Sequence, residues 1–483
     1  MMTEIAGAGP LTEVRIGSLV LERFEGLLDA GRYAELRAGI ARGPELLGGR
    51  TVWNVNSTAR GGGVAEMLMS LLAYARSAAV DARWLVISGD ERFFAITKRI
   101  HNRLHGFPGD GGPLGEAERE QYERALEANG RALRERLRPG DAVILHDPQT
   151  AGLIPHVRDL DVTVIWRCHV GVDAPNEIAL ETERFLGRYV MHADAVVFSR
   201  EPFAWDVLDP DRHTIIPPSI DVFAPKNEAL DEPTGRAILQ AAGLCAGGGD
   251  DVAATFTRLD GTPDAVRRRA EVFEDAPLAR GDEYVLQVSR WDALKDPLGV
   301  IAGFIEHIAP HSDAHLVYAG PAVNAVTDDP EVAAVLARAH EAWRALVPEL
   351  RRRVHLALLP MDDPEENAAI VNALQRHARH VVQKSLAEGF GLTVAEAMWK
   401  GRAVTASRIG GIQDQIEDGR SGVLLDDPHD LTAFGTAVTR LLRDRAASEA
   451  MGLAAQERVR EHFLGPQSLL AYLDLLGRLL HTS

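Results

Sequence analysis

The stretch Thr51–Ser88 reads TVWNVNSTARGGGVAEMLMSLLAYARSAAVDARWLVIS and indicates the fold class. It contains a short apolar strand (Thr51–Ser57), a glycine turn (Gly61–Gly63), an amphipathic helix (Val64–Ala79) and a second apolar strand (Arg83–Ser88). Buried strands separated by a helix are typical of a parallel sheet that helices cover on both faces. The stretch therefore predicts the first βαβ unit of a doubly wound α/β domain.

The alternation of strands and helices stops after residue 227 and restarts at residue 282. The segment between them, 228–281, is rich in Gly, Asp, Ala and Arg, and we expect an insertion or linker with a short helix at 264–273. We therefore expect an α/β protein with two Rossmann-like domains, 1–227 and 282–466, facing each other across a cleft at the carboxyl ends of their strands. The further expected strands are Asp141–Leu145, Val162–Trp166, Ala195–Ser199, Tyr284–Val288, Ala314–Tyr318, Val354–Leu358, His380–Gln383 and Ala403–Ala406, and the expected helices include residues 18–42, Leu298–His307, Thr393–Lys400, Leu431–Arg443 and Gln467–Leu480.

Composition narrows the class of partner. The formal net charge of -18, from 52 Lys and Arg against 70 Asp and Glu, makes nucleic acid and acidic membranes poor partners. The two cysteines, Cys168 and Cys245, can form neither a disulfide framework nor, alone, a structural zinc site. The amino terminus, MMTEIAGAGPLTEV, lacks the regions of a signal peptide, and no stretch is apolar enough to span a bilayer. We expect a cytoplasmic protein with no nucleic-acid or membrane partner.

The glycine turn Gly61-Gly62-Gly63 connects a strand to a helix. Its glycines allow close approach of a ligand to the backbone, and a helix N-terminus offers N–H groups and the positive end of the helix dipole. This predicts a cradle for phosphate or sugar oxygens, with a plain strand-to-helix turn as the alternative. The turn is neither a G-x-G-x-x-G fingerprint nor a P-loop, which argues against a dinucleotide dehydrogenase.

Two cations follow the first strand of the second domain, in the segment 289–296, SRWDALKD. Arg290 and Lys295 at a strand end are suited to bind a diphosphate, the first as a fork and the second as a point charge. They would also stabilise the charge that builds on a leaving phosphate. The alternative is a solvated, salt-bridged helix start, helped by Asp292 and Asp296.

The segment 384–398, KSLAEGFGLTVAEAM, holds two carboxylates. Glu388 lies in a glycine-containing loop, where it can accept hydrogen bonds from sugar hydroxyls, and Glu396 lies inside the following helix, where it can accept them from a ribose. An alternative exists for Glu396, because Thr393-x-x-Glu396 is a capping box. The other residues assigned to a donor site here are Gly389, Phe390, Gly391, Leu392 and Thr393.

Polar residues also follow two strands of the first domain. His169, at the end of the string Trp166–Gly171, is suited to hydrogen-bond a sugar hydroxyl or stabilise a cationic sugar, although a lone histidine at a strand end is usually structural. Its neighbour Cys168 points to the opposite face, so we expect a small buried residue rather than a Cys–His nucleophile. For His146-Asp147-Pro148-Gln149 both acceptor-sugar binding and a turn shaped by Asp-Pro stay open.

Together these motifs resemble the GT-B fold retaining glycosyltransferases of the large family four. Glu388 and Glu396 match that family's paired glutamates with seven residues between them, and Arg290 and Lys295 match its diphosphate-binding basic pair. The likeness runs from about residue 50 to the C-terminus. A narrower resemblance, to the trehalose-synthesising members, lies in Trp53–Thr58, Gly61–Glu66, His146–Gln149, Trp166–His169 and Val382–Gly391.

The resemblance implies an ADP-glucose or UDP-glucose donor, glucose as acceptor, and α,α-trehalose formed with retention. By analogy, Glu388 would hold the donor glucose, Glu396 the ribose, Arg290 and Lys295 the diphosphate, and His169 would contact the donor sugar. In this fold the last helix, about 467–483, usually packs back on the first domain. The remaining implied contacts are Gly61, Gly62 and Gly63 with phosphates and acceptor, backbone near Met361 with the base, and Asn56, His146, Asp147 and Gln149 with the acceptor.

The expected mechanism follows from the absence of a clear carboxylate nucleophile, which double displacement would require. The family uses front-face substitution, in which the leaving diphosphate accepts the acceptor proton. Because Arg290 and Lys295 can replace a cation and no Asp-x-Asp metal motif is evident at a strand end, we expect no cofactor and no metal requirement. The alternatives are a retaining trehalose phosphorylase, transfer to another sugar acceptor, or a non-catalytic nucleotide-sugar sensor, and the sequence leaves a homodimer open.

Overall fold

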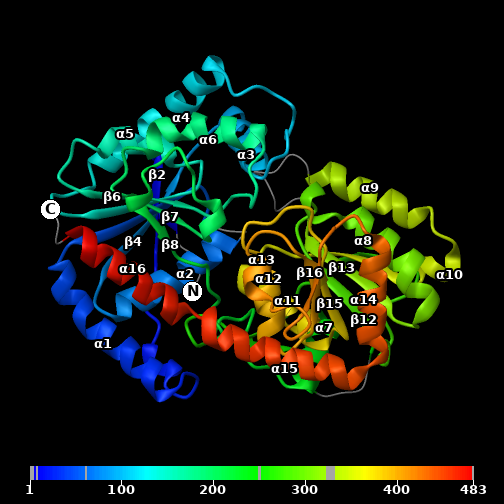
Figure 1. Cartoon of the computed structure of the whole chain (residues 1–483). Helices are drawn as coiled ribbons and strands as arrows, with labels where there is room; N and C mark the ends of the chain where they lie inside the picture. Colours follow the sequence, from blue (N-terminus) through cyan, green and yellow to red (C-terminus); the bar gives the residue numbers. More distant parts are fainter. Residues whose placement is uncertain (1–4, 7–8, 60–62, 248–251, 323–331, 481–483) are drawn as a thin grey trace. The chain divides into compact units, whose positions relative to one another are not determined.

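A computed structural model of the protein describes residues 5–6, 9–59, 63–247, 252–322 and 332–480. The chain divides into two compact units (Figure 1). Unit 1 comprises Met1–Ser219 and Leu464–Ser483, and unit 2 comprises Ile220–Phe463. No helix in the described ranges is long and apolar enough to cross a membrane.

Unit 1 is built on a sheet with the strand order β1-β2-β4-β3-β5-β6-β7-β8. The strands from β4 to β8 run parallel, and β1 and β2 add an antiparallel pair at one edge. The five strands expected from the sequence are all present, with ends shifted by at most two residues. The strands are β1 (Ile5–Ala6), β2 (Leu11–Val14), β3 (Thr51–Asn56), β4 (Asp81–Ile87), β5 (Ala142–His146), β6 (Thr163–Cys168), β7 (Ala195–Phe198) and β8 (His213–Ile215).

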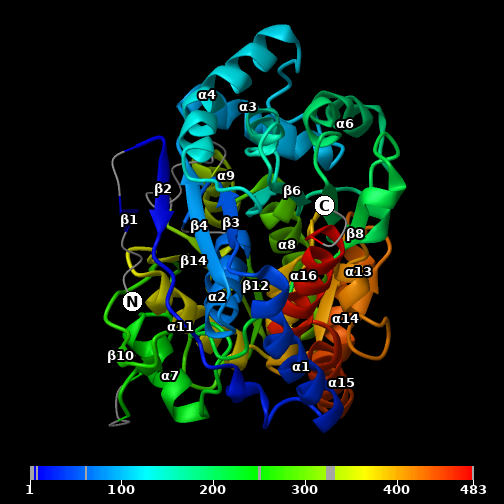
Figure 2. The ribbon, with the colours of Figure 1, turned by 90° about the vertical axis from the view of Figure 1, so that its left-hand side faces the viewer.

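Helices cover both faces of this sheet, and the last helix of the chain is one of them (Figure 2). α16 packs against α1 and α2, and the approach to α1 is so close that a Cβ on Gly39 would lie 2.2 Å from Leu470. The expected single helix over 18–42 is wrong: a 3-10 turn spans Leu21–Phe24, and α1 begins only after Asp29, whose side chain accepts hydrogen bonds from the backbone N–H groups of Gly31 and Arg32. The helices of unit 1 are α1 (Ala30–Leu47), α2 (Gly63–Ser77), α3 (Glu91–Leu104), α4 (Glu116–Arg134), α5 (Ile154–Val157), α6 (Glu177–Val190) and α16 (Gly465–Leu480).

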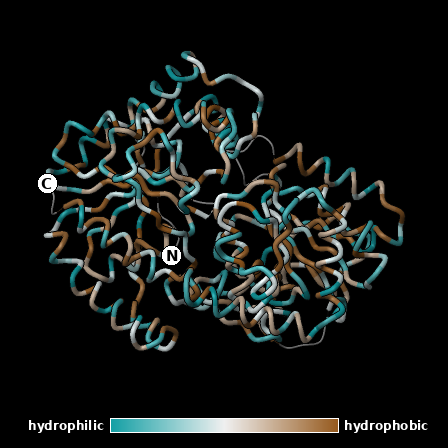
Figure 3. The backbone as a smooth tube through the Cα atoms, in the orientation of Figure 1, coloured by the Kyte–Doolittle hydropathy of each residue, from teal (hydrophilic) through white to brown (hydrophobic). Residues whose placement is uncertain are grey.

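Unit 2 contains a second sheet, in the order β11-β14-β13-β12-β15-β16-β17. All of its strands are parallel except β11, which pairs antiparallel with β14 at one edge. Most of the central strands of the two sheets are buried along their whole length, and hydrophobic stretches run through the middle of each unit (Figure 3). The strands are β11 (Glu271–Phe273), β12 (Tyr284–Val288), β13 (His315–Pro321), β14 (Val354–Leu359), β15 (His380–Gln383), β16 (Val404–Ser407) and β17 (Val423–Leu425), and the helices are α7 (Glu232–Ala241), α8 (Pro297–Gly303), α9 (Val332–Arg344), α10 (Pro348–Arg351), α11 (Pro364–His377), α12 (Leu392–Trp399), α13 (Ile412–Gln415), α14 (Leu431–Arg443) and α15 (Arg445–His462).

Residues 228–281 lie within unit 2 and contribute β11 to its sheet. They also form a small hairpin of β9 (Thr255–Thr257) and β10 (Pro263–Ala265). The expected short helix at 264–273 is wrong, since these residues belong to β10, a connection and β11. The physical reason lies in the backbone: the N–H groups of Arg267 and Arg268 donate to the side chain of Glu366 instead of to carbonyls within a helix.

Candidate functional site

Two adjacent strands of unit 2 bring Lys295 and Glu388 together. β12 and β15 are parallel neighbours, so the segments that follow them leave the sheet at the same edge. The ammonium nitrogen of Lys295 lies 2.6 Å from Oε2 of Glu388, and the two side chains are 14% and 13% exposed. Two groups taken from separate sequence motifs thus form one partly buried ion pair.

The other charged residues of segment 289–296 have different partners. Nη2 of Arg290 lies 3.3 Å from Oδ2 of Asp292, while Asp296 pairs with the buried Lys384. Arg290 therefore forms a salt bridge within this segment, as the alternative predicted, whereas Lys295 pairs with Glu388 outside it. Sequence reasoning missed the role of Lys384, whose signal is a lysine directly after the buried strand β15.

The loop that carries Glu388 is held by a pair of glycines that sequence reasoning did not single out. The N–H of Gly411 donates to the carbonyl of Gly389 at 2.8 Å. Gly410, with φ +47°, lies so close that a Cβ there would be 2.0 Å from the carbonyl oxygen of Glu388. The available signal was the Gly-Gly pair shortly after β16.

Glu396 is buried in α12, behind that loop. Its Oε1 lies 3.5 Å from Nζ of Lys226, and its Oε2 has no hydrogen-bond partner among the described residues. The capping-box alternative is wrong, because Gly391, with φ +81°, stands at the N-cap and starts the helix at Leu392. Thr393 is thus inside the helix, and its hydroxyl donates to Oε1 of Gln383 at 3.2 Å.

Two more residues assigned to the donor site lie in unit 2. Phe390 is buried between Gly389 and Gly391, and its ring packs edge-on against Phe463. Met361 is partly buried in the short loop between β14 and α11. Because that loop also follows a parallel strand, it leaves the sheet at the same edge as the Lys295–Glu388 pair.

In unit 1, the adjacent strands β5 and β6 bring two histidines together. Nδ1 of His146 lies 3.2 Å from Nε2 of His169, and the rings stack at 13°. Nε2 of His146 lies 3.0 Å from Oδ1 of Asn54, which can only accept, so this nitrogen carries the proton and Nδ1 accepts from His169. Oδ1 of Asp147 accepts a 2.8 Å hydrogen bond from the backbone N–H of His169. Sequence reasoning did not single out Asn54.

Burial sets the charges of this group. It lowers the pKa of His146 to about 3 and that of His169 well below its ordinary value, and the positive charge of Arg167 lowers both further. Burial raises the pKa of Asp147 to about 7, although the hydrogen bond from the N–H of His169 and the positive charge of Arg167 both act to lower it. Near neutral pH both imidazoles are therefore uncharged, and Asp147 is close to the midpoint of its titration.

Arg167 itself is fully buried inside β6. Its Nη2 donates to Oγ of Ser199 at 3.5 Å, while Nε and Nη1 lack hydrogen-bond partners among the described residues. The hydroxyl of Tyr472, on α16, is buried and equally without a partner in that part of the chain. The buried positive charge of Arg167 is close enough to Asp147 to lower the pKa of that carboxyl.

The remaining unit 1 residues that the sequence assigned to ligand binding differ in how exposed they are and in whether their polar groups already have partners. Asn56 is buried, and its amide is engaged by the indole of Trp84 at 2.8 Å and the carbonyl of Thr58 at 2.7 Å. Gln149 is partly buried in the turn after β5. Gly61 and Gly62 lie outside the described residues, and Gly63 is the first residue of α2.

Cys168 is a small buried residue, as expected. Its Sγ donates to the carbonyl of Val170 at 3.1 Å, and burial raises the pKa of the thiol well above its ordinary value. A thiol that stays protonated and buried does not act as a nucleophile.

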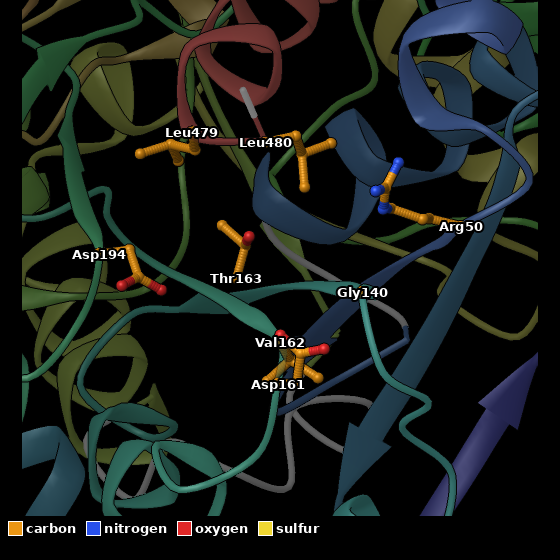
Figure 4. A pocket seen from close by; sticks show the side chains of 8 residues that line it. All are labelled: Arg50, Gly140, Asp161, Val162, Thr163, Asp194, Leu479 and Leu480. Atoms are coloured by element: carbon orange, nitrogen blue, oxygen red, sulfur yellow. The ribbon is translucent and has the colours of Figure 1, made fainter. Parts of the chain in front are cut away.

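A cavity of about 530 Å³ in unit 1 lies away from these groups (Figure 4). It is found at the amino ends of β5 and β6, opposite the edge that carries His146 and His169. Figure 4 shows Leu479 and Leu480 of α16 on one side and Asp161 and Val162 on the other. We therefore assign the candidate site to the carboxyl edges of the sheets and not to this cavity.

Comparison with known proteins gives two family matches. Residues 54–205 match the family described as the N-terminal domain of trehalose synthase, and residues 269–458 match the family of group 1 glycosyl transferases. These ranges include the histidine pair of unit 1 and the Lys295–Glu388 pair of unit 2.

Individual relatives agree with these matches. The chain is 33% identical to trehalose synthases of Rubrobacter xylanophilus, over 97% of this chain and 99% of the relative, and of Pyrococcus horikoshii, over 90% and 91%. Trehalose phosphorylase of Grifola frondosa is more distant, at 25% identity over 84% of this chain and 54% of the relative. An α,α-trehalose-phosphate synthase (UDP-forming) from Burkholderia vietnamiensis superposes with a TM-score of 0.63 at 13% identity, covering 90% of this chain and 99% of that one. The α/β, GT-B fold expected from the sequence is confirmed.

Proposed function

This chain belongs to the trehalose synthase family of glycosyltransferases, and on that premise we propose that it makes α,α-trehalose from a nucleotide-glucose donor and glucose, with retention at the donor carbon. The observation that carries the proposal is the Lys295–Glu388 pair at the carboxyl edge of the unit 2 sheet. A cation and a carboxylate at one strand edge suit a substrate that combines a diphosphate with sugar hydroxyls.

The donor half of the reaction is assigned to unit 2. Lys295 and Arg290 bind the diphosphate and stabilise the charge that develops on it as the glycosidic bond breaks. Glu388 accepts hydrogen bonds from hydroxyls of the donor glucose. Glu396, whose Oε2 is buried without a partner among the described residues, accepts them from the ribose. Backbone groups near Met361 contact the base, and ADP-glucose or UDP-glucose is the donor.

The acceptor half is assigned to unit 1. The Asp147 carboxylate, near its titration midpoint at neutral pH, accepts a hydrogen bond from a hydroxyl of the acceptor glucose. Gln149 orients the same sugar, His146 acts through its contact with His169, and the uncharged imidazole of His169 contacts the donor sugar. Asn56 acts through the turn that it holds at Thr58.

The proposed mechanism is front-face substitution without a protein nucleophile. The hydroxyl of the acceptor glucose attacks the anomeric carbon from the side that the diphosphate leaves, and the diphosphate takes the hydroxyl proton. The protein contributes position and electrostatic stabilisation. Because Lys295 and Arg290 supply the positive charge, the reaction requires no metal.

Incubation with ADP-, UDP- or GDP-glucose plus ¹³C-glucose, with the product identified by NMR, tests this function. We expect an α,α-1,1-linked disaccharide labelled in one ring and an equal amount of nucleoside diphosphate. Because the chain is also distantly similar to a trehalose phosphorylase, a second incubation contains trehalose and inorganic phosphate without any nucleotide. Release of glucose 1-phosphate there, with no disaccharide from any nucleotide-glucose, would overturn the proposal.

A further inference from the structure

The hairpin segment, residues 255–268, makes a concentrated set of ionic contacts with the start of α11. Arg258 is its centre, with a side chain that is 20% exposed. Its two terminal nitrogens form a fork on the carboxylate of Asp363, and Nε donates to Oδ2 of Asp264 at 2.7 Å. The backbone N–H of Leu259 donates to Glu365 at 2.6 Å. A bidentate, partly buried arginine fixes the geometry of both partners.

A second contact lies beside the first. Glu366 is 2% exposed and accepts hydrogen bonds from the backbone N–H groups of Arg267 at 2.5 Å and Arg268 at 2.6 Å. The guanidinium of Arg268 also pairs with this carboxylate. A buried carboxylate with three donors from one segment ties that segment firmly to the helix.

These contacts fix one end of the loop Pro360–Asp362, which connects β14 to α11. Asp363 is the N-cap of α11 and follows this loop directly. The other end is fixed by the sheet, because β11 pairs along β14 and the N–H of Ala322 donates to the carbonyl of Leu359 at 2.9 Å. Both ends of the loop are therefore held in place. The hairpin segment holds the end at α11, and β11 holds the end at β14, so residues between 228 and 281 contribute at both ends.

The position of this loop matters for the proposed donor. β14 is two strands from β12 in the sheet, roughly 10 Å at the usual strand spacing, and both strands end at the same edge. A nucleotide whose diphosphate lies at Lys295 can extend along this edge and bring its base to the loop. Its backbone groups would then read the hydrogen-bonding edge of the base.

We propose that the hairpin segment is a brace that holds the loop Pro360–Asp362 in the conformation that selects the nucleotide base. Arg258 is the principal positioning residue of this brace and acts through Asp363 and Glu365. The inference rests on the proposed function, since it assigns the base subsite of the same donor. It gives residues 228–281 a role in donor selectivity.

The test compares R258M, which removes the fork but keeps an apolar stem, with R258K and with R236M. Arg236 is a matched control, because it lies in the same inserted stretch and pairs with a carboxylate, Glu232, that is 73% exposed. Each full-length variant is assayed with ADP-, UDP- and GDP-glucose, for donor KM, glucose KM and kcat. Hydrogen exchange is measured in parallel on peptides that cover residues 359–367.

For R258M we expect the KM of the preferred donor to rise about tenfold, the equivalent of one lost charge-assisted contact, while kcat and glucose KM change less than about twofold. The ratio of KM values between the preferred donor and the other two should become smaller, and hydrogen exchange at residues 359–367 should be faster. R258K should give values between those of R258M and the wild type, and R236M should match the wild type. If R258M does not fold, R258K and R268M must show the same pattern in weaker form.

An active R258M with unchanged base preference, or with unchanged exchange at 359–367, would overturn the brace and leave the proposed function intact. Failure of the proposed function shows differently, as a wild-type protein that forms no disaccharide from any of the three donors. A rise in all three donor KM values by the same factor would also overturn the inference, because it indicates a general loss of structure and not of base selection.

Discussion

The ammonium of Lys295 and a carboxylate oxygen of Glu388 lie 2.6 Å apart at the carboxyl edge of the unit 2 sheet. Each is the ionic partner of the other, although 93 residues separate them in the chain. A donor that binds its diphosphate to Lys295 and its sugar hydroxyls to Glu388 exchanges this one contact for several. The pair also keeps both side chains ordered, which reduces the entropy lost when the donor binds.

Removing either member of the pair should abolish most of the activity. We expect K295M and E388Q each to lower kcat about 100- to 1,000-fold, since each loses an interaction with charge or hydroxyls at the reacting sugar. The double variant should be little worse than either single variant, because the groups act as a unit. Initial rates by trehalose quantification measure this. R420M, which removes a cation that is 73% exposed, is the control, and near-normal rates in K295M or E388Q would contradict the site.

The acceptor glucose should bind less well in acid. Burial raises the pKa of Asp147 to about 7, so its carboxylate is ionised above that pH and protonated below it. The ionised group is the stronger hydrogen-bond acceptor, and the KM for glucose should therefore rise as the pH falls from 8 to 6. D147N should have a high and nearly pH-independent glucose KM. A wild-type glucose KM that stays flat across this range would refute the assignment of Asp147.

The glycine at position 410 allows the Glu388 loop to approach closely. In G410A the new Cβ would meet the carbonyl oxygen of Glu388 at 2.0 Å and displace the loop, so we expect kcat/KM for the donor to fall at least about 100-fold. G419A is the matched control, because Gly419 also has a left-handed φ, +77°, but nothing within 4 Å of an added Cβ. It should lose about 1 kcal/mol of stability and retain its activity. Equal losses of activity in both variants would show that backbone strain, and not the clash, is responsible.

Stability in acid should depend on His380. Its ring is fully buried beside Thr405, at 2.9 Å, and burial lowers its pKa to about 3. Below the usual histidine pKa of about 6.5 the unfolded chain gains a proton that the folded chain does not, so the free energy of unfolding falls as the pH drops from 6.5 towards 3. Above 6.5 this contribution is constant.

H380Q should remove this part of the pH dependence, worth a few kcal/mol at most, as measured by urea unfolding between pH 4 and 8. H429Q, at an exposed position in the same unit, should follow the wild-type curve. A wild-type slope that persists in H380Q would assign the acid sensitivity to other groups, among them His146 and His169, whose pKa values burial also lowers.

Chelation should leave the reaction unaffected. Arg290 and Lys295 provide the positive charge that a metal ion would otherwise bring to the diphosphate. Activity after dialysis against EDTA should match that of untreated protein, and added magnesium should not raise it. Loss of activity on chelation that magnesium restores would overturn this part of the mechanism.

The sequence predicted the central strands well because their apolar runs are continuous and bounded by turns. β12 and β15 have the bounds that were expected. The edge strands β9, β10 and β11 were missed, since each has three residues and its pairing depends on distant partners. The short strands β1 and β2 at the amino terminus were also missed, because their pairing likewise depends on partners that the local sequence does not reveal.

At the site, residue types were predictable and partners were not. The motifs marked Lys295 and Glu388 separately, but their contact follows from the adjacency of β12 and β15, which periodicity does not report. Likewise, Arg258 and Asp363 are 105 residues apart, and nothing local marks them as a pair. The capping-box alternative for Glu396 failed because the left-handed backbone of Gly391 started the helix earlier than the side-chain pattern indicated.

The return of α16 to unit 1 has a consequence for biosynthesis. Tyr472, Leu475 and Leu476 fill a core together with residues of β5 and β6, so the part of this core that α16 covers stays exposed until Ile220–Phe463, the whole of unit 2, has been synthesised. Domains usually fold as they emerge, and exposed apolar surface favours aggregation. Unit 1 begins to be synthesised before unit 2, but its core is completed only after α16 has been made, and part of its apolar surface is exposed in the meantime.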